Sequence, residues 1–154
     1  HTYSYLYGLR STGLRYFTVY GPWGRPDMAI FLFTDKILRN EPIQVFNHGN
    51  MKRDFTYIND IISGTRTAID KNFACEIFNL GNHKSVELMD VVRLIEQKLG
   101  KKAEIEFLPM QPGDIPESLA DIEKSEEFLG FKPTTGISSD IEDFVEWYKE
   151  YNTE

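Results

Sequence analysis

The sequence has little of several features that mark common classes of protein. It contains one cysteine, Cys75, so no internal disulfide can form, and a buried, reduced thiol in a cytoplasmic protein is the expectation. Its three histidines are scattered without metal-ligand spacing, so no metal site is predicted. No apolar run approaches the length that crosses a bilayer. The net charge of −7 argues against nucleic acid as a partner, because binding a phosphate backbone needs a basic face.

The N-terminal residues, HTYSYLYGLR, lack an initiator methionine and the basic and apolar regions of a signal peptide. They are typical instead of the last turns of a helix that begins upstream, so we expect the chain to be part of a longer protein. The composition, 41% hydrophobic and 27% charged, is that of a globular domain rather than of a disordered segment.

Hydrophobic periodicity alternates between strand-like and helix-like segments, which predicts an α/β fold. One continuous strand is predicted over residues 12–19, ended by the turn at Gly21-Pro22. The other predicted strands cover residues 43–46, 53–57, 76–80 and 103–108, and the predicted helices cover residues 29–38, 60–70, 86–99, 122–129 and 138–151. Ser85 is the expected N-cap of one helix, and Gly100 its C-terminal stop.

The most informative segment is RYFTVYGPWGRPDMA, residues 15–29, which joins a strand to a glycine- and proline-rich loop carrying one arginine. A guanidinium presents a planar fork of donors that matches a carboxylate, and a threonine hydroxyl can add one more hydrogen bond to the same oxygens. Thr18 and Arg25 are therefore candidates for binding a carboxylate. On spacing alone, the alternative is that Arg25 is a solvated loop residue and Thr18 only a strand hydroxyl.

The second motif, KRDFTY, begins just after a turn at residues 48–50. A cation in this position can meet a diphosphate through charge-assisted hydrogen bonds. The alternative is a surface ion pair between Arg53 and Asp54, worth about 0–1 kcal/mol. Phe55 and Tyr57 are predicted to pack in the core.

A third candidate segment is the loop QPGD, residues 111–114. A loop carboxylate such as Asp114 can accept hydrogen bonds from both hydroxyls of a ribose. The alternative is an aspartate that only forms a turn after Gly113.

The two longer motifs, RYFTVYGPWGRPDMA and RDFTYINDI, resemble the second half of an extended short-chain dehydrogenase/reductase in the NAD-dependent epimerase/dehydratase family. The greatest similarity is to the UDP-glucuronate 4-epimerases. The resemblance implies the C-terminal part of a Rossmann-like α/β fold, in which the last sheet strands join a small mixed α/β substrate-binding domain. Residues 1–154 are then the substrate-binding portion, and the NAD-binding domain lies outside the chain. No glycine-rich dinucleotide fingerprint and no Tyr-x-x-x-Lys pair occurs in it, so alone it is expected to be inactive and not to bind NAD.

The resemblance also assigns roles to residues of the first motif. Thr18 and Arg25 are implied to hold the carboxylate at C5 of the sugar, and Tyr20 to border the NAD cofactor. Oxidation of a glucuronate at C4 gives a β-keto acid, which loses carbon dioxide when the carboxylate bond aligns with the carbonyl π system. Holding the carboxylate blocks that alignment.

The remaining implied contacts concern the nucleotide. Arg53 is implied to bind the diphosphate, and Asp114 the ribose. Val45 and Phe46 belong to a strand similar to the one that meets uracil, although a purely buried strand is the alternative. Gln111 stands where many relatives carry a diphosphate-binding arginine, so it keeps hydrogen-bonding capacity without the charge.

The implied reaction of the complete protein is the interconversion of UDP-glucuronate and UDP-galacturonate by transient oxidation at C4 with NAD, using a tyrosine and a lysine upstream of this chain. One alternative is a UDP-glucuronate decarboxylase or sugar-nucleotide dehydratase, which would more often carry asparagine at position 18. Another is a non-catalytic UDP-sugar-binding module. Exposed sheet edges predict a homodimer or association with the protein's own N-terminal half.

Overall fold

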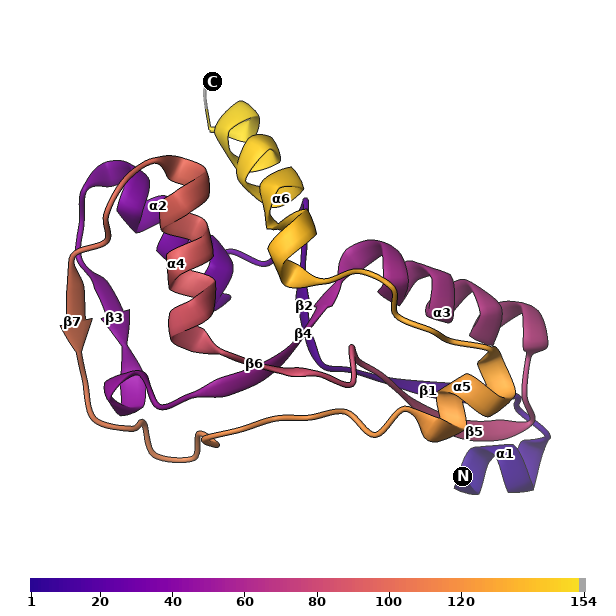
Figure 1. Ribbon diagram of the computed structural model, residues 1–154. Coiled ribbons are helices and arrows are strands. Elements are labelled where there is room, and N and C mark those ends of the chain that lie inside the picture. Colours follow the sequence, from indigo (N-terminus) through magenta and orange to yellow (C-terminus); the bar gives the residue numbers. More distant parts are fainter. Residues whose placement is uncertain (153–154) are drawn as a thin grey trace.

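Three small sheets organise the chain in the computed structural model, which describes residues 1–152 (Figure 1). Within this range the strands are β1 (Ser11–Tyr16), β2 (Thr18–Tyr20), β3 (Ile43–Val45), β4 (Lys52–Tyr57), β5 (Cys75–Leu80), β6 (Ser85–Glu87) and β7 (Ile105–Phe107). The helices are α1 (Thr2–Tyr7), α2 (Ala29–Arg39), α3 (Ile58–Lys71), α4 (Leu88–Leu99), α5 (Glu123–Leu129) and α6 (Ile137–Tyr151), with a 3-10 turn η1 (Phe46–Gly49). The α/β prediction is confirmed.

The strands pair as β1–β5, β2–β4–β6 and β3–β7, and all pairs are parallel except β4–β6. The prediction of one strand over residues 12–19 is wrong, because the chain changes partner at Phe17. The N–H of Phe17 still donates to the C=O of Leu80 in β5, at 3.1 Å, and the next residue, Thr18, lies opposite Phe55 in β4. The loop after β2 therefore leaves from the central sheet.

Two apolar clusters flank the central sheet and hold it in place. The larger gathers α2, α4 and α6 around β3 and β4, and the smaller gathers α3 and α5 on β5. In α2 the side chains of Ile30, Phe33 and Ile37 recur at helical spacing and are all nearly fully buried. Each stabilises the fold by about 1.5–3 kcal/mol, so α2 is a rigid wall for whatever lies beside it.

Helix ends were predicted with mixed success. Gly100 ends α4 in the left-handed conformation, at φ 65°, as predicted. Ser85 is not an N-cap. Residues 85–87 instead form β6 on β4, and α4 begins at Leu88 after Glu87 with no side-chain cap. Cys75, predicted to be buried, is only half-buried at the start of β5.

A long segment, residues 108–122, runs from β7 at one end of the molecule to α5 at the other and is drawn in orange in Figure 1. It is tied to the start of β4 on the way. The N–H of Lys52 donates to the C=O of Pro116 at 2.8 Å, and the N–H of Ser118 donates to the C=O of Lys52 at 3.2 Å. This path brings residues 111–114 beside the second motif.

Candidate functional site

Four segments that are distant in the sequence line one cavity of about 300 Å³ beside α2. This volume is at the lower end of the range of about 300–1,000 Å³ that is usual for small-molecule sites. Its lining includes five of the residues singled out from the sequence, namely Thr18, Phe46, Arg53, Gln111 and Asp114. The structure therefore brings together candidates from the three motifs and from the strand predicted to meet uracil.

Arg53 and Asp114 form the charged centre of this cavity. Nη2 of Arg53 donates to Oδ1 of Asp114 at 2.8 Å, and Nη1 donates to the C=O of Lys52 at the same distance. The same Asp114 oxygen accepts the N–H of Ile115 at 2.8 Å. The Arg53 side chain is only 18% exposed, so its charge is partly shielded from water. A guanidinium has five donor hydrogens, and the three that do not make these bonds are available for an anionic ligand.

Asp54 has a different role from the surface ion pair that was considered for it. Its side chain is fully buried, and its carboxylate accepts the backbone N–H groups of Asn82, His83 and Ala120 at 2.6, 3.0 and 2.9 Å. The hydroxyl of Thr56 donates to it at 3.2 Å. The surface-pair interpretation is wrong, because alternation along β4 turns Arg53 toward the cavity and Asp54 into the protein.

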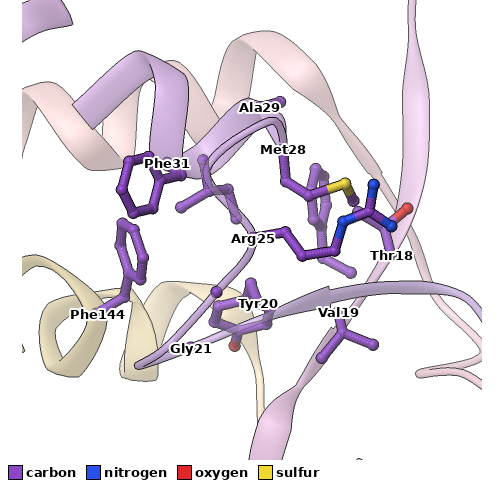
Figure 2. Close-up of a pocket in the computed structure, with 12 residues that line it drawn as sticks. Thr18, Val19, Tyr20, Gly21, Arg25, Met28, Ala29, Phe31 and Phe144 are labelled. Atoms are coloured by element: carbon purple, nitrogen blue, oxygen red, sulfur yellow. The ribbon is translucent and has the colours of Figure 1, made fainter. Parts of the chain in front are cut away.

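Arg25 lies at the other end of the candidate site, in the loop that follows β2. Figure 2 shows its side chain extending from the loop toward Thr18, and both residues line one small pocket of about 20 Å³. Nε and Nη2 of Arg25 donate to the two carboxylate oxygens of Asp27 at 3.0 and 2.5 Å. These bonds hold the pKa of Asp27 below its ordinary value. The Arg25 side chain is 74% exposed, so it is accessible to a ligand.

Tyr20, the predicted cofactor neighbour, lies at the end of β2. It is nearly fully buried, but it lines a cavity of about 460 Å³ together with Trp23 and Arg25. Within residues 1–152 its hydroxyl has no hydrogen-bond partner, and burial raises the pKa of Tyr20 above its ordinary value. The cavity lies beyond the carboxyl end of a parallel strand, where open α/β sheets usually bind ligands.

The predicted uracil strand is split between the core and the cavity. The side chain of Val45 is fully buried, so this residue could reach a ligand only through its main chain, whose C=O already accepts the N–H of Leu108 at 2.9 Å. Phe46 is half-buried and lines the cavity, as does Gln44, whose Nε2 donates to Glu106 at 3.1 Å.

Sequence reasoning missed the residues that complete the walls of the cavity. Asp27 was not considered, although it is in the first motif and sets the orientation of Arg25. Met28 and Leu32 add apolar surface from the start of α2. Leu32 lies off the buried stripe of α2 and is 40% exposed, and an exposed apolar residue on an amphipathic helix is the signal that could have revealed it.

Neither a metal site nor a membrane-spanning helix is found within the described residues. No three His, Cys, Asp or Glu side chains among residues 1–152 are grouped so that they could hold a metal ion. In the same range, none of the helices combines the length and the apolar character needed to cross a membrane.

The fold and the cavities described above define the class of protein. Parallel strands flanked by helices, with ligand-sized cavities beside the central sheet, make this an α/β protein of the Rossmann-like short-chain dehydrogenase/reductase type. The model of the NAD dependent epimerase/dehydratase family matches residues 1–81, which include Thr18, Arg25 and Arg53. The chain belongs to this family.

Within this family, the chain is similar to several individual proteins. An uncharacterized protein of Methanocaldococcus jannaschii is 53% identical over 97% of this chain and 46% of its own length. UDP-glucuronate 4-epimerase 4 of Arabidopsis thaliana is 44% identical over 98% of this chain and 38% of its own length. The crystal structure of UDP-glucuronic acid 4-epimerase from Bacillus cereus, in complex with UDP-glucuronic acid and NAD, superimposes with a TM-score of 0.92 at 36% identity. The superposition covers 98% of this chain and 49% of the Bacillus cereus chain. The chain therefore spans about half the length of these relatives, or less.

Proposed function

We propose that residues 1–154 are the substrate-binding portion of a longer NAD-dependent epimerase that interconverts UDP-glucuronate and UDP-galacturonate. One observation carries the proposal. Thr18 lines both the small pocket that it shares with Arg25 and the larger cavity that contains Arg53 and Asp114. The candidate carboxylate-binding pair and the cation proposed for a diphosphate thus line neighbouring pockets that share Thr18, as a nucleotide sugar with an acidic sugar ring requires.

The nucleotide end of the proposed substrate fits the larger cavity. Arg53 supplies the positive charge for the diphosphate, and Asp114 supplies acceptors for the ribose hydroxyls. Phe46 borders the space proposed for the uracil base, whereas the buried Val45 is not among the residues that line the cavity. Gln111 adds a neutral hydrogen-bonding group, so the diphosphate depends mainly on Arg53.

The sugar end requires that Arg25 bind a second carboxylate besides Asp27. Nε and one hydrogen of Nη2 are engaged with Asp27, which leaves Nη1 and the remaining Nη2 hydrogen for a ligand. Asp27 therefore orients the guanidinium without using all of its donors. Thr18 adds a hydroxyl from β2, so the carboxylate of the sugar is held from two elements.

Restraint of this carboxylate has a chemical purpose in the proposed reaction. A sugar oxidised at C4 next to a C5 carboxylate is a β-keto acid and loses carbon dioxide when the scissile bond is parallel to the carbonyl π orbitals. Arg25 and Thr18 keep the carboxylate in one rotamer, so that the carbon skeleton survives until C4 is reduced again.

The cofactor that the family name implies is NAD, which supplies the hydride acceptor when it is bound. This chain fits only one edge of such a group. Tyr20 and residues 21–24 border the cavity beyond β2, but no glycine-rich fingerprint occurs in the sequence. We place the main NAD site and the catalytic tyrosine and lysine outside residues 1–154, and we expect no NAD binding by the chain alone.

The proposed arrangement also explains an apolar surface on the sheet β1–β5. The helices α3 and α5 pack on one face of this parallel sheet, whereas Ile77, on the opposite face, remains 59% exposed. Parallel sheets are normally covered on both faces. The proposed cover is the NAD-binding portion, or a second copy of the chain when that portion is missing. A stable monomer in light scattering of the isolated chain at high concentration would contradict this.

The reaction is tested with the complete gene product, NAD and UDP-glucuronate. The expected result is UDP-galacturonate, identified by the change in the proton coupling at C4 in NMR spectra. Arg25→Ala is expected to lower epimerisation and to raise the share of decarboxylated product, measured by mass spectrometry. Decarboxylated sugar as the main wild-type product would identify a decarboxylase, and binding without turnover would favour a non-catalytic module. An unchanged product distribution in Arg25→Ala would contradict the carboxylate role.

A further inference from the structure

The loop that carries Arg25 begins with a turn containing an unusual residue. The N–H of Gly24 donates to the C=O of Gly21 at 3.1 Å, which closes a β-turn over residues 21–24. Pro22 occupies the second position, where its ring fixes a negative φ, and Trp23 occupies the third with φ 63°. This is the pattern of a type II turn, whose third position normally belongs to glycine. A positive φ is unfavourable for any residue with a Cβ, and for a bulky one it is an outlier.

An aromatic cluster holds Trp23 in this conformation. The ring centroid of Trp23 lies 5.5 Å from that of Trp147 and 5.6 Å from that of Tyr151, and the latter two rings are stacked at 5.2 Å. All three distances are in the range of favourable aromatic pairs. Both partners belong to α6, which the buried side chain of Phe144 anchors in the larger core cluster. Trp23 is 76% exposed, so its ring contacts fix the loop to α6 rather than bury the residue.

Arg25 depends on this contact because its own bonds are local. The guanidinium of Arg25 donates to both carboxylate oxygens of Asp27, two residues further along the same loop. These bonds orient the guanidinium relative to the loop but not relative to β2, where Thr18 lies. The ring of Trp23, two residues before Arg25, connects the loop to the body of the protein.

We propose that Trp23 is a positioning residue: by docking on Trp147 and Tyr151, it holds the loop so that Arg25 faces Thr18, and it thereby sets the preference for a sugar with a carboxylate. The inference rests on the proposed function of this site. UDP-glucuronate and UDP-glucose differ only at C6, so displacement of Arg25 weakens binding of the first and leaves the second almost unchanged. The apparent affinity falls in proportion to the fraction of molecules with the loop docked.

The test compares four variants of the complete protein. Trp23→Ala removes the ring and keeps the unfavourable φ, and Trp23→Gly removes the ring but accepts a positive φ freely. Tyr151→Ala removes one ring of the cluster from an exposed position on α6, and Tyr151→Phe is its matched control. The readouts are the KM of UDP-glucuronate and the inhibition constant of UDP-glucose against it.

Trp23→Ala is expected to raise the KM of UDP-glucuronate about threefold to tenfold, the range set by the loss of one or two aromatic contacts. Trp23→Gly and Tyr151→Ala should give smaller increases, and Tyr151→Phe should match the wild type. The inhibition constant of UDP-glucose should change by less than about twofold in all four, because it does not depend on Arg25.

A KM within about twofold of the wild type in both Trp23 variants would overturn the inference, and so would an equal rise in both constants. The two proposals fail in different ways. If Arg25→Ala removes the preference for UDP-glucuronate and Trp23→Ala does not, only the positioning role is wrong. If the wild-type protein shows no preference for UDP-glucuronate, the proposed function itself fails.

Discussion

The buried carboxylate of Asp54 gives the sharpest stability prediction, through the substitution Asp54→Asn. Oδ1 accepts the N–H of Asn82 and the hydroxyl of Thr56, and Oδ2 accepts the N–H groups of His83 and Ala120. These bonds join β4 to the turn after β5 and to the long segment before α5. An asparagine of the same shape replaces one of the two oxygens with an NH₂ group, which meets at least one N–H donor in either orientation.

The expected cost follows from that mismatch. One buried N–H left unpaired costs about 1–3 kcal/mol, and the remaining bonds weaken because they no longer go to a charged acceptor. A loss of about 3 kcal/mol in the free energy of unfolding is therefore expected. For a protein of this size it corresponds to a fall of roughly 6–12 °C in Tm.

Urea denaturation followed by circular dichroism measures this loss, with Asp90→Asn as the matched control. Asp90 is an exposed aspartate of α4 that forms an ion pair with Arg93 in the same helix, so Asp90→Asn makes the same chemical change at the surface. An exposed pair contributes about 0–1 kcal/mol, so the control should remain close to the wild type. If Asp54→Asn is no less stable than Asp90→Asn, the buried carboxylate does not join these segments as described.

Two further predictions concern packing and ionisation. Gly64→Ala places a Cβ 2.7 Å from Cδ2 of Phe131, so urea denaturation should show a loss of about 1–3 kcal/mol in the free energy of unfolding. The control Ser63→Ala, on the exposed side of the same helix, should change that free energy by less than about 0.5 kcal/mol. Equal stabilities of the two variants would contradict the close packing at Gly64. Burial, with the hydrogen bond to Asp35, raises the pKa of Tyr148 to about 12. Because an unfolded tyrosine ionises near pH 10, stability from Tyr148 is complete below about pH 10 and is lost as the pH rises toward 12. The fall in Tm over this interval should be shallower in Tyr148→Phe, and an unchanged slope would contradict the assignment.

Local features were predictable from the sequence because they depend on near neighbours. The period of 3.6 residues identified α2 and α6, and the predicted ranges, residues 29–38 and 138–151, differ from the observed ones by one residue at one end. Gly100 was recognisable as a helix stop because a left-handed residue favours glycine. The motif residues Thr18 and Arg25 came from the resemblance of one continuous segment.

The remaining features depend on contacts between distant parts of the chain. Nothing in the sequence around Phe17 marks the end of a strand. The strand is interrupted there because β1 pairs with β5, whereas β2 pairs with β4. The pairing of Arg53 with Asp114 depends on the path of the segment after β7, for which no local pattern exists. Asp54 can be buried because its carboxylate accepts three backbone N–H groups from the turn after β5 and the long segment before α5, and a charged residue in a strand gives no sign of such remote donors.

A crystal structure of the complete protein with UDP-glucuronate and NAD would show whether Arg25 and Thr18 bind the sugar carboxylate. We expect that carboxylate within about 2.7–3.0 Å of a guanidinium nitrogen of Arg25 and of Oγ1 of Thr18, with the diphosphate against Arg53. A sugar carboxylate that points away from the loop, with Arg25 bound only to Asp27, would contradict it.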